Sequence, residues 1–241
     1  MGAALAEAAA KRGDRVSAWN RTVAKARALE AFGVRAAATV PEAIAGADRV
    51  HVILADDAVV DTVLDTAGEA LRSALVIDHS TTSPAGTVAR ARRLEARGIA
   101  FLHAPVFMSP RMCREAGGLM LVAGPQTTFT RAKEALRAMT GRVEYLGERR
   151  DLAAANKLFG NAMIIAICGG LADVYAMAAS LGIDARDAHA HRARIRLRRH
   201  GRPGGRRRAE EAATPMNRRP PQRVQQRTSV RKLRWTAVRR G

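Results

Sequence analysis

Hydrophobic and polar positions alternate between two kinds of segment from Met1 to Asp151. Short apolar runs rich in β-branched residues are separated by longer stretches in which apolar residues recur at helical spacing. Strands are predicted at Arg15–Trp19, Val50–Leu54, Leu75–Asp78, Ala100–Val106, Leu119–Ala123 and Val143–Leu146. Helices are predicted near Met1–Lys11, Val23–Phe32, Ala58–Leu71, Pro84–Ala96 and Thr127–Met139.

This alternation predicts an α/β fold built on a doubly wound, largely parallel sheet. Runs such as Val50–Leu54 and Leu75–Asp78 are almost continuously apolar, which is typical of strands covered on both faces. Strands that alternate with helices are joined by right-handed crossovers, which place helices on both faces of the sheet.

A single long helix, Leu152–Ser180, is predicted after Asp151. It is apolar nearly all round, so we expect it to be buried against other helices, and Gly182 is a plausible cap at its end. Its longest uncharged apolar run, Ala162–Ala172, is too short to cross a bilayer, and no signal peptide opens the chain. These features predict a cytoplasmic protein with no membrane partner.

The formal charge of +19 is concentrated in the C-terminal tail. From Asp187 to Gly241 the chain has 17 Arg and one Lys against three acidic residues, whereas residues 1–186 are nearly balanced. Helical and strand periodicity stop at the same point, so we expect the tail to be disordered. The predicted organisation is residues 1–151 as one α/β domain, 152–186 as the start of a helical domain, and 187–241 as a basic tail.

Two hypotheses account for the tail. Its excess of Arg over Lys and its abundant Pro and Gly favour an out-of-frame translation of a GC-rich gene, beginning near Asp187. The alternative is an arm that binds nucleic acid by neutralising phosphates. Only Trp235 could stack on bases there, so we consider a nucleic-acid partner the weaker hypothesis.

The beginning of the chain resembles a dinucleotide-binding βαβ unit. Gly2 opens the first predicted helix 18 residues before Asn20, close to the interval between the last glycine of G-x-G-x-x-G and the cofactor-selecting residue. The first strand and the two earlier glycines would lie before Met1, so we expect the sheet to lack its first strand. Asn20, Arg21 and Thr22 offer neutral donors and a guanidinium in place of an acid, which suits the 2′-phosphate of NADP.

Three later motifs resemble the β-hydroxyacid dehydrogenases, the family of 3-hydroxyisobutyrate and 6-phosphogluconate dehydrogenases. Leu54–Asp57 resembles the cofactor-contacting loop, Ile77–Pro84 the substrate loop, and Asn156–Asn161 the K-x-x-x-N signature. The segment from Ala104 to Pro110 departs from the family, because Phe107-Met108-Ser109 stands where Ser-Gly-Gly is common. This departure puts bulk where backbone amides usually approach the substrate carboxylate.

The resemblance implies an oxidoreductase that uses NADP, with NAD also possible, to interconvert a small 3-hydroxy acid and its carbonyl form. It implies a homodimer for the intact protein and no metal. The implied substrate-binding residues are Ser80, Thr81, Ser109 and Asn161, and the implied cofactor-binding residues are Gly2, Asn20, Arg21, Thr22, Leu54, Asp56 and Ser80. His79 and His103 receive no role, and we interpret them as packing residues.

Lys157 is the candidate catalytic residue, because an amine buried beside a cationic cofactor can exchange protons near neutrality. Asn161 lies four residues further on the same helical face and could hold the substrate. Without a complete glycine turn or a helical domain to close the cleft, we expect weak cofactor binding and little turnover. A non-catalytic dinucleotide-binding remnant is therefore the alternative.

Overall fold

The computed structural model describes residues 1–194 and 234–239. The chain divides into two compact units, one formed by residues 1–163 with 231–241 and the other by residues 164–230. The first unit holds both sheets, and the second holds the later part of the long helix and the helix that follows it.

The main sheet has six strands in the order β2-β1-β9-β3-β4-β5, and every pair of neighbours is parallel. Its strands are β1 (Arg15–Asn20), β2 (Arg35–Ala36), β3 (Arg49–Ile53), β4 (Leu75–Asp78), β5 (Ala100–His103) and β9 (Arg234–Arg239). If β9 is counted as the first strand, this is the 3-2-1-4-5-6 order of a dinucleotide-binding fold. The prediction of a doubly wound, Rossmann-like sheet is confirmed.

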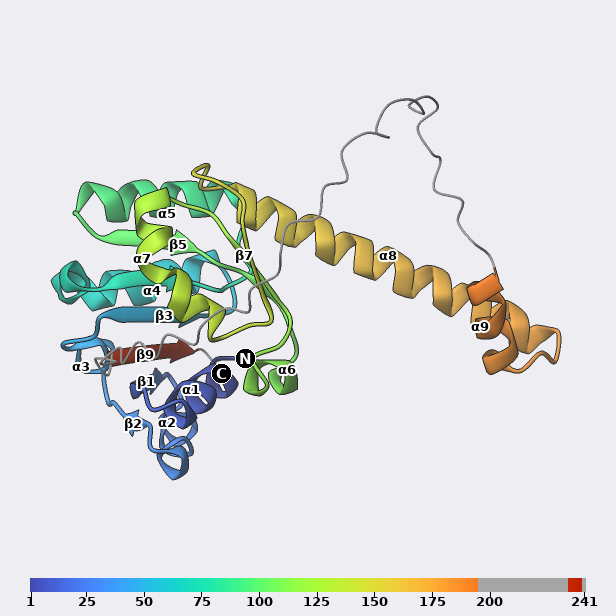
Figure 1. Cartoon of the computed structure of the whole chain (residues 1–241), viewed down its shortest axis with the longest axis horizontal. Coiled ribbons are helices and arrows are strands. Elements are labelled where there is room, and N and C mark those ends of the chain that lie inside the picture. Colours follow the sequence, from blue (N-terminus) through green and yellow to red (C-terminus); the bar gives the residue numbers. More distant parts are fainter. Residues whose placement is uncertain (195–233, 240–241) are drawn as a thin grey trace, which may run out of the picture. The chain divides into compact units, whose positions relative to one another are not determined.

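Strand β9 fills the position that we expected to be empty. It lies between β1 and β3 (Figure 1), where Ala237 pairs with Ala18 on one side and with His51 on the other. The expectation of a sheet without its first strand therefore needs correction, because a segment from the C-terminal end occupies that place. Two unpaired strand edges present a row of free backbone groups, and an extended segment of the same chain satisfies them.

Helices cover both faces of the main sheet, as the apolar strands predicted. They are α1 (Gly2–Lys11), α2 (Val23–Arg27), α3 (Val40–Ile44), α4 (Asp57–Ala67), α5 (Pro84–Ala96), α6 (Pro110–Arg114) and α7 (Gln126–Arg137), with 3₁₀ turns η1 (Glu30–Phe32) and η2 (Gly68–Ser73). Successive residues of β4 belong to different core clusters, since Leu75 and Ile77 pack with α1 and α7 whereas Val76 packs with α4 and α5.

The strands after β5 form a second sheet instead of extending the first. It has the order β6-β7-β8, with β6 (Val106–Phe107) antiparallel to β7 (Leu119–Val122) and β7 parallel to β8 (Arg142–Tyr145). The predicted strand Ala100–Val106 is therefore divided at Pro105, which has no backbone N–H for a ladder. The predicted helix Val23–Phe32 is likewise divided into α2 and η1.

The long helix α8 (Leu152–Ser180) has the bounds that the sequence predicted. Gly182 follows it at φ +68°, and the N–H of Ile183 donates to Ala178 O over 2.9 Å, so the glycine does close the helix. Contrary to the expected burial against other helices, most apolar side chains from Phe159 to Met177 are exposed in this chain, Phe159 to 63%.

The basic tail differs from the expected disorder in two stretches. Helix α9 (Ala185–Arg194) follows α8, with Asp184 Oδ1 accepting from the N–H of Arg186 over 2.7 Å, and β9 belongs to the main sheet. The Asp184 cap accounts for the start of helix α9. Backbone pairing with β1 and β3 accounts for strand β9. The expectation of disorder over 195–233 and 240–241 lies outside the described residues.

Candidate functional site

The ends of β3 and β4 are joined by residues that the sequence singled out. The N–H of Leu54, directly after β3, donates to Ser80 Oγ over 2.9 Å. The N–H of Ser80 donates to Asp78 Oδ1 over 2.8 Å, and Ser80 is only 2% exposed. The implied cofactor loop and the implied substrate loop therefore meet at the carboxyl edge of the sheet.

Gly2 and Asn20 line one small pocket, together with Trp19 and residues of α2. Gly2 is the first residue of α1 and Asn20 the last residue of β1. Asn20 Oδ1 accepts from the N–H of Thr22 over 2.9 Å, which leaves the Asn20 amide group as a donor. The sequence interval between Gly2 and Asn20 thus corresponds to proximity in space.

A second pocket of about 160 Å³ adjoins the first. It is lined by Trp19, Arg21 and Leu54 with residues of α4, and Trp19 belongs to both pockets. Four of the implied cofactor residues, Gly2, Asn20, Arg21 and Leu54, therefore gather at the carboxyl ends of β1 and β3. These strands flank β9, where the strand order reverses, and open α/β sheets bind ligands at that point.

The donors at this edge suit an anionic dinucleotide. The N-terminus of the ten-residue helix α1 carries the positive end of its dipole, and neither pocket is lined by an acidic side chain. One element of the usual phosphate site differs. The strand beside α1 is β9, from the other end of the chain, so no glycine turn links that strand to the helix.

The remaining implied contacts lie outside these pockets. Asp56 and Ser109 are N-caps, because Asp56 Oδ1 accepts from Val59 N over 2.9 Å and Ser109 Oγ from Met112 N over 3.2 Å. Thr22 precedes α2 without a side-chain cap, and Thr81 is exposed beside the buried Ser80. The structure does not bring these four side chains together with the others.

Lys157 and Asn161 are half-buried on one face of α8. The Nζ atom of Lys157 lies 3.7 Å from the centroid of the Phe107 ring. Burial lowers the pKa of Lys157 below its usual value, in the direction that a proton-exchanging amine requires. The residues described here include no acidic side chain that forms an ion pair with this lysine.

A buried ionic cluster beneath the β4 loop was not predicted. The fully buried Arg90 donates to Asp61 over 2.7 Å and to Asp57 over 2.9 Å, and its Nη1 lies 3.4 Å from Asp78 Oδ2. Asp57 also accepts from the N–H of Ser83 over 2.8 Å. The sequence gives no sign of it, because Arg90 stands in a helix with two other arginines, Arg92 and Arg93, that stay at least partly exposed.

This cluster keeps Asp78 ionised at the base of the site. Burial by itself would raise the pKa of Asp78, but His103, Arg90 and the Ser80 N–H favour the carboxylate and lower its pKa overall. An ionised Asp78 accepts from Ser80, so Arg90 supports the position of Ser80 indirectly.

The interpretation of His79 and His103 as packing residues agrees with their burial, since they are 4% and 0% exposed. His79 Nδ1 donates to Ala104 O over 2.7 Å, so its Nε2 accepts, and His51 Nδ1 lies 2.9 Å from it. Burial lowers the pKa of His79 to about 4 and that of His51 well below its ordinary value. Both rings are therefore neutral at neutral pH.

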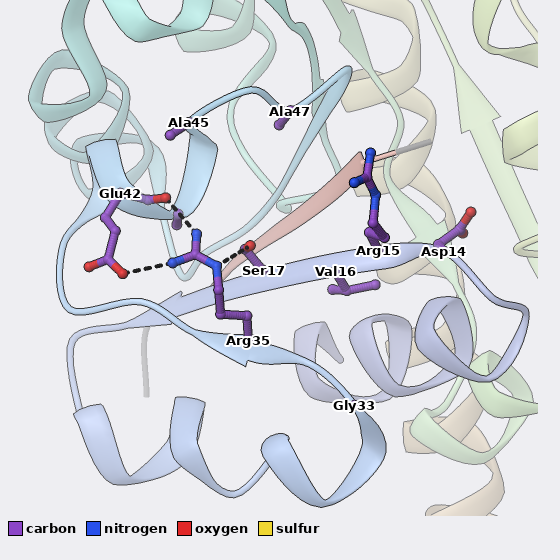
Figure 2. Close-up of a pocket in the computed structure, with 10 residues that line it drawn as sticks. Asp14, Arg15, Val16, Ser17, Gly33, Arg35, Glu42, Ala45 and Ala47 are labelled. Atoms are coloured by element: carbon purple, nitrogen blue, oxygen red, sulfur yellow. Dashed lines mark hydrogen bonds and ion pairs between the residues drawn. The ribbon is translucent and has the colours of Figure 1, made fainter. Parts of the chain in front are cut away.

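A larger pocket of about 540 Å³ lies at the opposite, amino end of β1. Figure 2 shows that Arg35 points across it toward Ser17 and Glu42. Because Arg35 donates to Glu42 Oε1 over 2.7 Å and to Ser17 Oγ over 3.1 Å, its charge is already partnered. This pocket lies at the other edge of the sheet from the residues implied by the sequence, and its arginine is already paired. We therefore do not assign it to the cofactor site.

Comparisons with known proteins show the family of the α/β unit and its fold. Residues 1–147 match the family model described as the NAD binding domain of 6-phosphogluconate dehydrogenase. An NADPH-dependent reductive aminase of Aspergillus oryzae is 26% identical over 66% of this chain, and the match spans 56% of that relative. The chain thus covers little more than half of that relative.

Solved structures of an imine reductase and a dehydrogenase have the same fold. An imine reductase from Streptomyces aurantiacus superposes with a TM-score of 0.75 and 28% identity, covering 79% of this chain and 68% of that one. The 3-hydroxyisobutyrate dehydrogenase of Mycobacterium tuberculosis superposes with a TM-score of 0.74 and 26% identity, covering 81% and 67%.

Proposed function

Because the chain belongs to the family of the NAD-binding domain of 6-phosphogluconate dehydrogenase, we propose that it is an NADP-dependent oxidoreductase acting on a small 3-hydroxy acid or its carbonyl form. The observation that carries this proposal is the gathering of Gly2, Asn20, Arg21 and Leu54 on two adjoining pockets at the carboxyl edge. Arg21 supplies the charge for a 2′-phosphate, and the N-terminus of α1 supplies amides for the other phosphates.

The nicotinamide, when bound, would exchange a hydride with the substrate carbon. Lys157 handles the proton: in reduction its ammonium group donates to the oxygen that gains negative charge, and in oxidation the neutral amine accepts. Asn161 holds the substrate hydroxyl or carboxylate from the same helical face. Ser80, held by Leu54 and Asp78, presents its loop to the substrate.

Phe107 favours a second candidate for the substrate class. It stands where the family commonly has Ser-Gly-Gly, and its ring lies under the Lys157 ammonium group. A neutral carbonyl or imine substrate would tolerate this apolar group better than a carboxylate would. Similar proteins include an NADPH-dependent reductive aminase and an imine reductase. Turnover of a 3-hydroxy acid and of a neutral imine of equal size would separate the two candidates.

The first experiment is a fluorescence titration of NADPH and NADH with the full chain and with Arg21→Ala. One or two charge-assisted hydrogen bonds are lost, so NADPH should bind about tenfold more weakly while NADH affinity stays unchanged. Arg72→Ala is the matched control, because Arg72 is exposed and lines neither pocket. Equal losses for both cofactors, or for both variants, would contradict the assignment of Arg21.

A version of the chain preceded by a strand and a complete glycine turn tests the phosphate site. If only that version binds NADPH, the domain assignment holds and the chain as written binds poorly. If the chain binds NADPH but has no measurable turnover for Lys157→Ala to lower, the protein is the non-catalytic alternative. If binding to DNA is abolished by removing residues 187–241, the tail has the nucleic-acid role instead.

The apolar character of helix α8 is relevant to the expected cytoplasmic location of the protein. By length and composition alone it could cross a membrane, with a mean hydropathy of 1.8 in its most apolar part, so the expectation that its apolar run is too short was wrong. The core helix of a soluble protein meets the same criterion, and α8 begins with buried Ala153 and Ala154 packed in the α/β unit. We infer that α8 is a core helix of a cytoplasmic protein.

A further inference from the structure

The side chain of Phe107 occupies a defined place between the second sheet and the beginning of α8. In β6, Phe107 pairs with Leu119 of β7. Its half-buried ring packs against the small cluster formed by Leu121, Ala123 and Ala153. Phe107 is therefore held by β7 and by the first turn of α8, and one face of its ring meets α8 further along.

The Lys157 ammonium group lies over that face, 3.7 Å from the ring centroid. A cation at this distance is attracted by the electron-rich face of an aromatic ring, and the attraction grows as water is excluded. Strands β6 and β7 contain no charged residue, and Asp151, which precedes α8, is paired with Arg149 over 2.7 Å. The Phe107 ring is therefore a contact that can compensate this half-buried charge.

Gly160 completes the arrangement one turn further along α8. A Cβ atom at this position would overlap the Cζ atom of Phe107 and lie 2.9 Å from its Cε1 atom. Glycine is unfavourable inside a helix, so its presence here needs a reason. The close approach of the Phe107 ring provides one.

We propose that Phe107 is a positioning residue for Lys157, and that its ring holds the lysine in place and stabilises the protonated form. This inference rests on the proposed proton role of Lys157. It makes Lys157 chiefly a proton donor at neutral pH, which favours reduction. The substrate carbon accepts a hydride from the reduced nicotinamide, the oxygen or nitrogen takes one proton from Nζ, and the lysine is left as a neutral amine.

The opposing influence on Lys157 is its burial, which lowers the pKa. Removing the aromatic face should therefore lower the pKa further. A partly desolvated cation–π contact corresponds to a shift of roughly half a unit to one unit. No cofactor is needed for this effect, so it can be measured even if the proposed function fails.

The test measures the reactivity of Lys157 in the full chain. The pH dependence of its modification by acetic anhydride is followed by mass spectrometry, with the exposed Lys25 as the internal reference in each digest. Phe107→Leu keeps the bulk and removes the ring, so Lys157 should react about three- to tenfold faster at neutral pH relative to Lys25. Phe107→Tyr, which keeps a ring, should behave like the unchanged chain.

A second measurement needs no variant. After reductive methylation with ¹³C-formaldehyde, the methyl groups on Lys157 should show an upfield ring-current shift in the NMR spectrum that disappears in 6 M guanidinium chloride. If this shift is absent, or if folded Phe107→Leu leaves the pKa of Lys157 unchanged, the proposal is overturned. If both signatures are present but neither the full chain nor the version with the added glycine turn binds NADPH, the proposed function alone is overturned.

Discussion

Leu54 and Ser80 are joined by one hydrogen bond of 2.9 Å from a backbone N–H to a buried hydroxyl. They lie 26 residues apart in the sequence and at the ends of neighbouring strands, β3 and β4. The contact aligns the two loops that carry Leu54, Asp56, Ser80 and Thr81 of the implied site. It also gives the Ser80 hydroxyl a structural role, before any contact with a substrate is considered.

Replacing Ser80 with alanine should destabilise the protein as well as disturb the site. The N–H of Leu54 would lose its acceptor while remaining buried, which costs about 1–3 kcal/mol. Urea unfolding monitored by circular dichroism measures the loss. Ser73→Ala, at an exposed position, is the control and should change stability by less than about 0.5 kcal/mol. Equal midpoints for the two variants would show that the hydrogen bond is dispensable.

Arg90→Met should be among the most destabilising single changes in the α/β unit. It leaves Asp78, which is fully buried, without its cationic partner, and removal of one member of a buried pair costs about 3–5 kcal/mol. Arg93→Met is the matched control. Arg93 pairs with Asp61 and Asp65 but is 39% exposed, so its loss should cost at most about 1 kcal/mol. The prediction fails if both variants unfold at the same urea concentration.

Stability should fall as the pH drops below the unfolded pKa of histidine. The folded pKa of His79 is about 4 against an ordinary 6.5, so only the unfolded chain binds a proton between these values. His79 therefore stabilises the fold fully above pH 6.5, and this contribution is lost progressively down to pH 4. Between pH 7 and pH 5 the free energy of unfolding should decrease by about 2 kcal/mol from His79 alone.

Urea titrations of the unchanged chain and of His79→Gln at several pH values measure this effect. His51 acts in the same direction, so the variant should keep part of the slope. The lowered pKa of Asp78 contributes only at more acidic pH, because its ordinary value is 3.8. Identical slopes for the two proteins would mean that His79 titrates normally in the folded state.

Removal of β9 should expose the edges of β1 and β3. Hydrogen exchange followed by mass spectrometry should show about tenfold or greater loss of protection in Val16–Asn20 and Val50–Ile53 when the chain ends at residue 233. A chain that ends at Arg239 keeps the strand and is the control. If segment 234–239 of the full chain exchanges like a free peptide, its place in the sheet is refuted.

Local periodicity explains why so much of the fold was predictable. Apolar runs such as Leu75–Asp78 and the long helix Leu152–Ser180 depend on residues that are close in sequence, and their bounds agree with the structure. The interval from Gly2 to Asn20 was also informative, because one helix and one strand of ordinary length fill it. A helix that returns into a parallel strand brings its first residue close to the end of that strand, and Gly2 and Asn20 do line the same pocket.

Contacts between distant segments could not be read in this way. Nothing local distinguishes Arg90 from its exposed neighbours or indicates that Phe107 meets Lys157, 50 residues further along the chain. Similarly, six residues of an arginine-rich tail gave no sign that they would pair with both β1 and β3.

The sequence by itself therefore determined the class of fold, the long helix and the family to which the chain belongs. These depend on short-range periodicity and on motifs with fixed spacing. Only the tertiary structure decided which strand completes the sheet, which charges are buried, and which side chain compensates Lys157. Those properties arise when backbone groups and charges lose water and must find partners, and the partners come from wherever the fold brings the chain together.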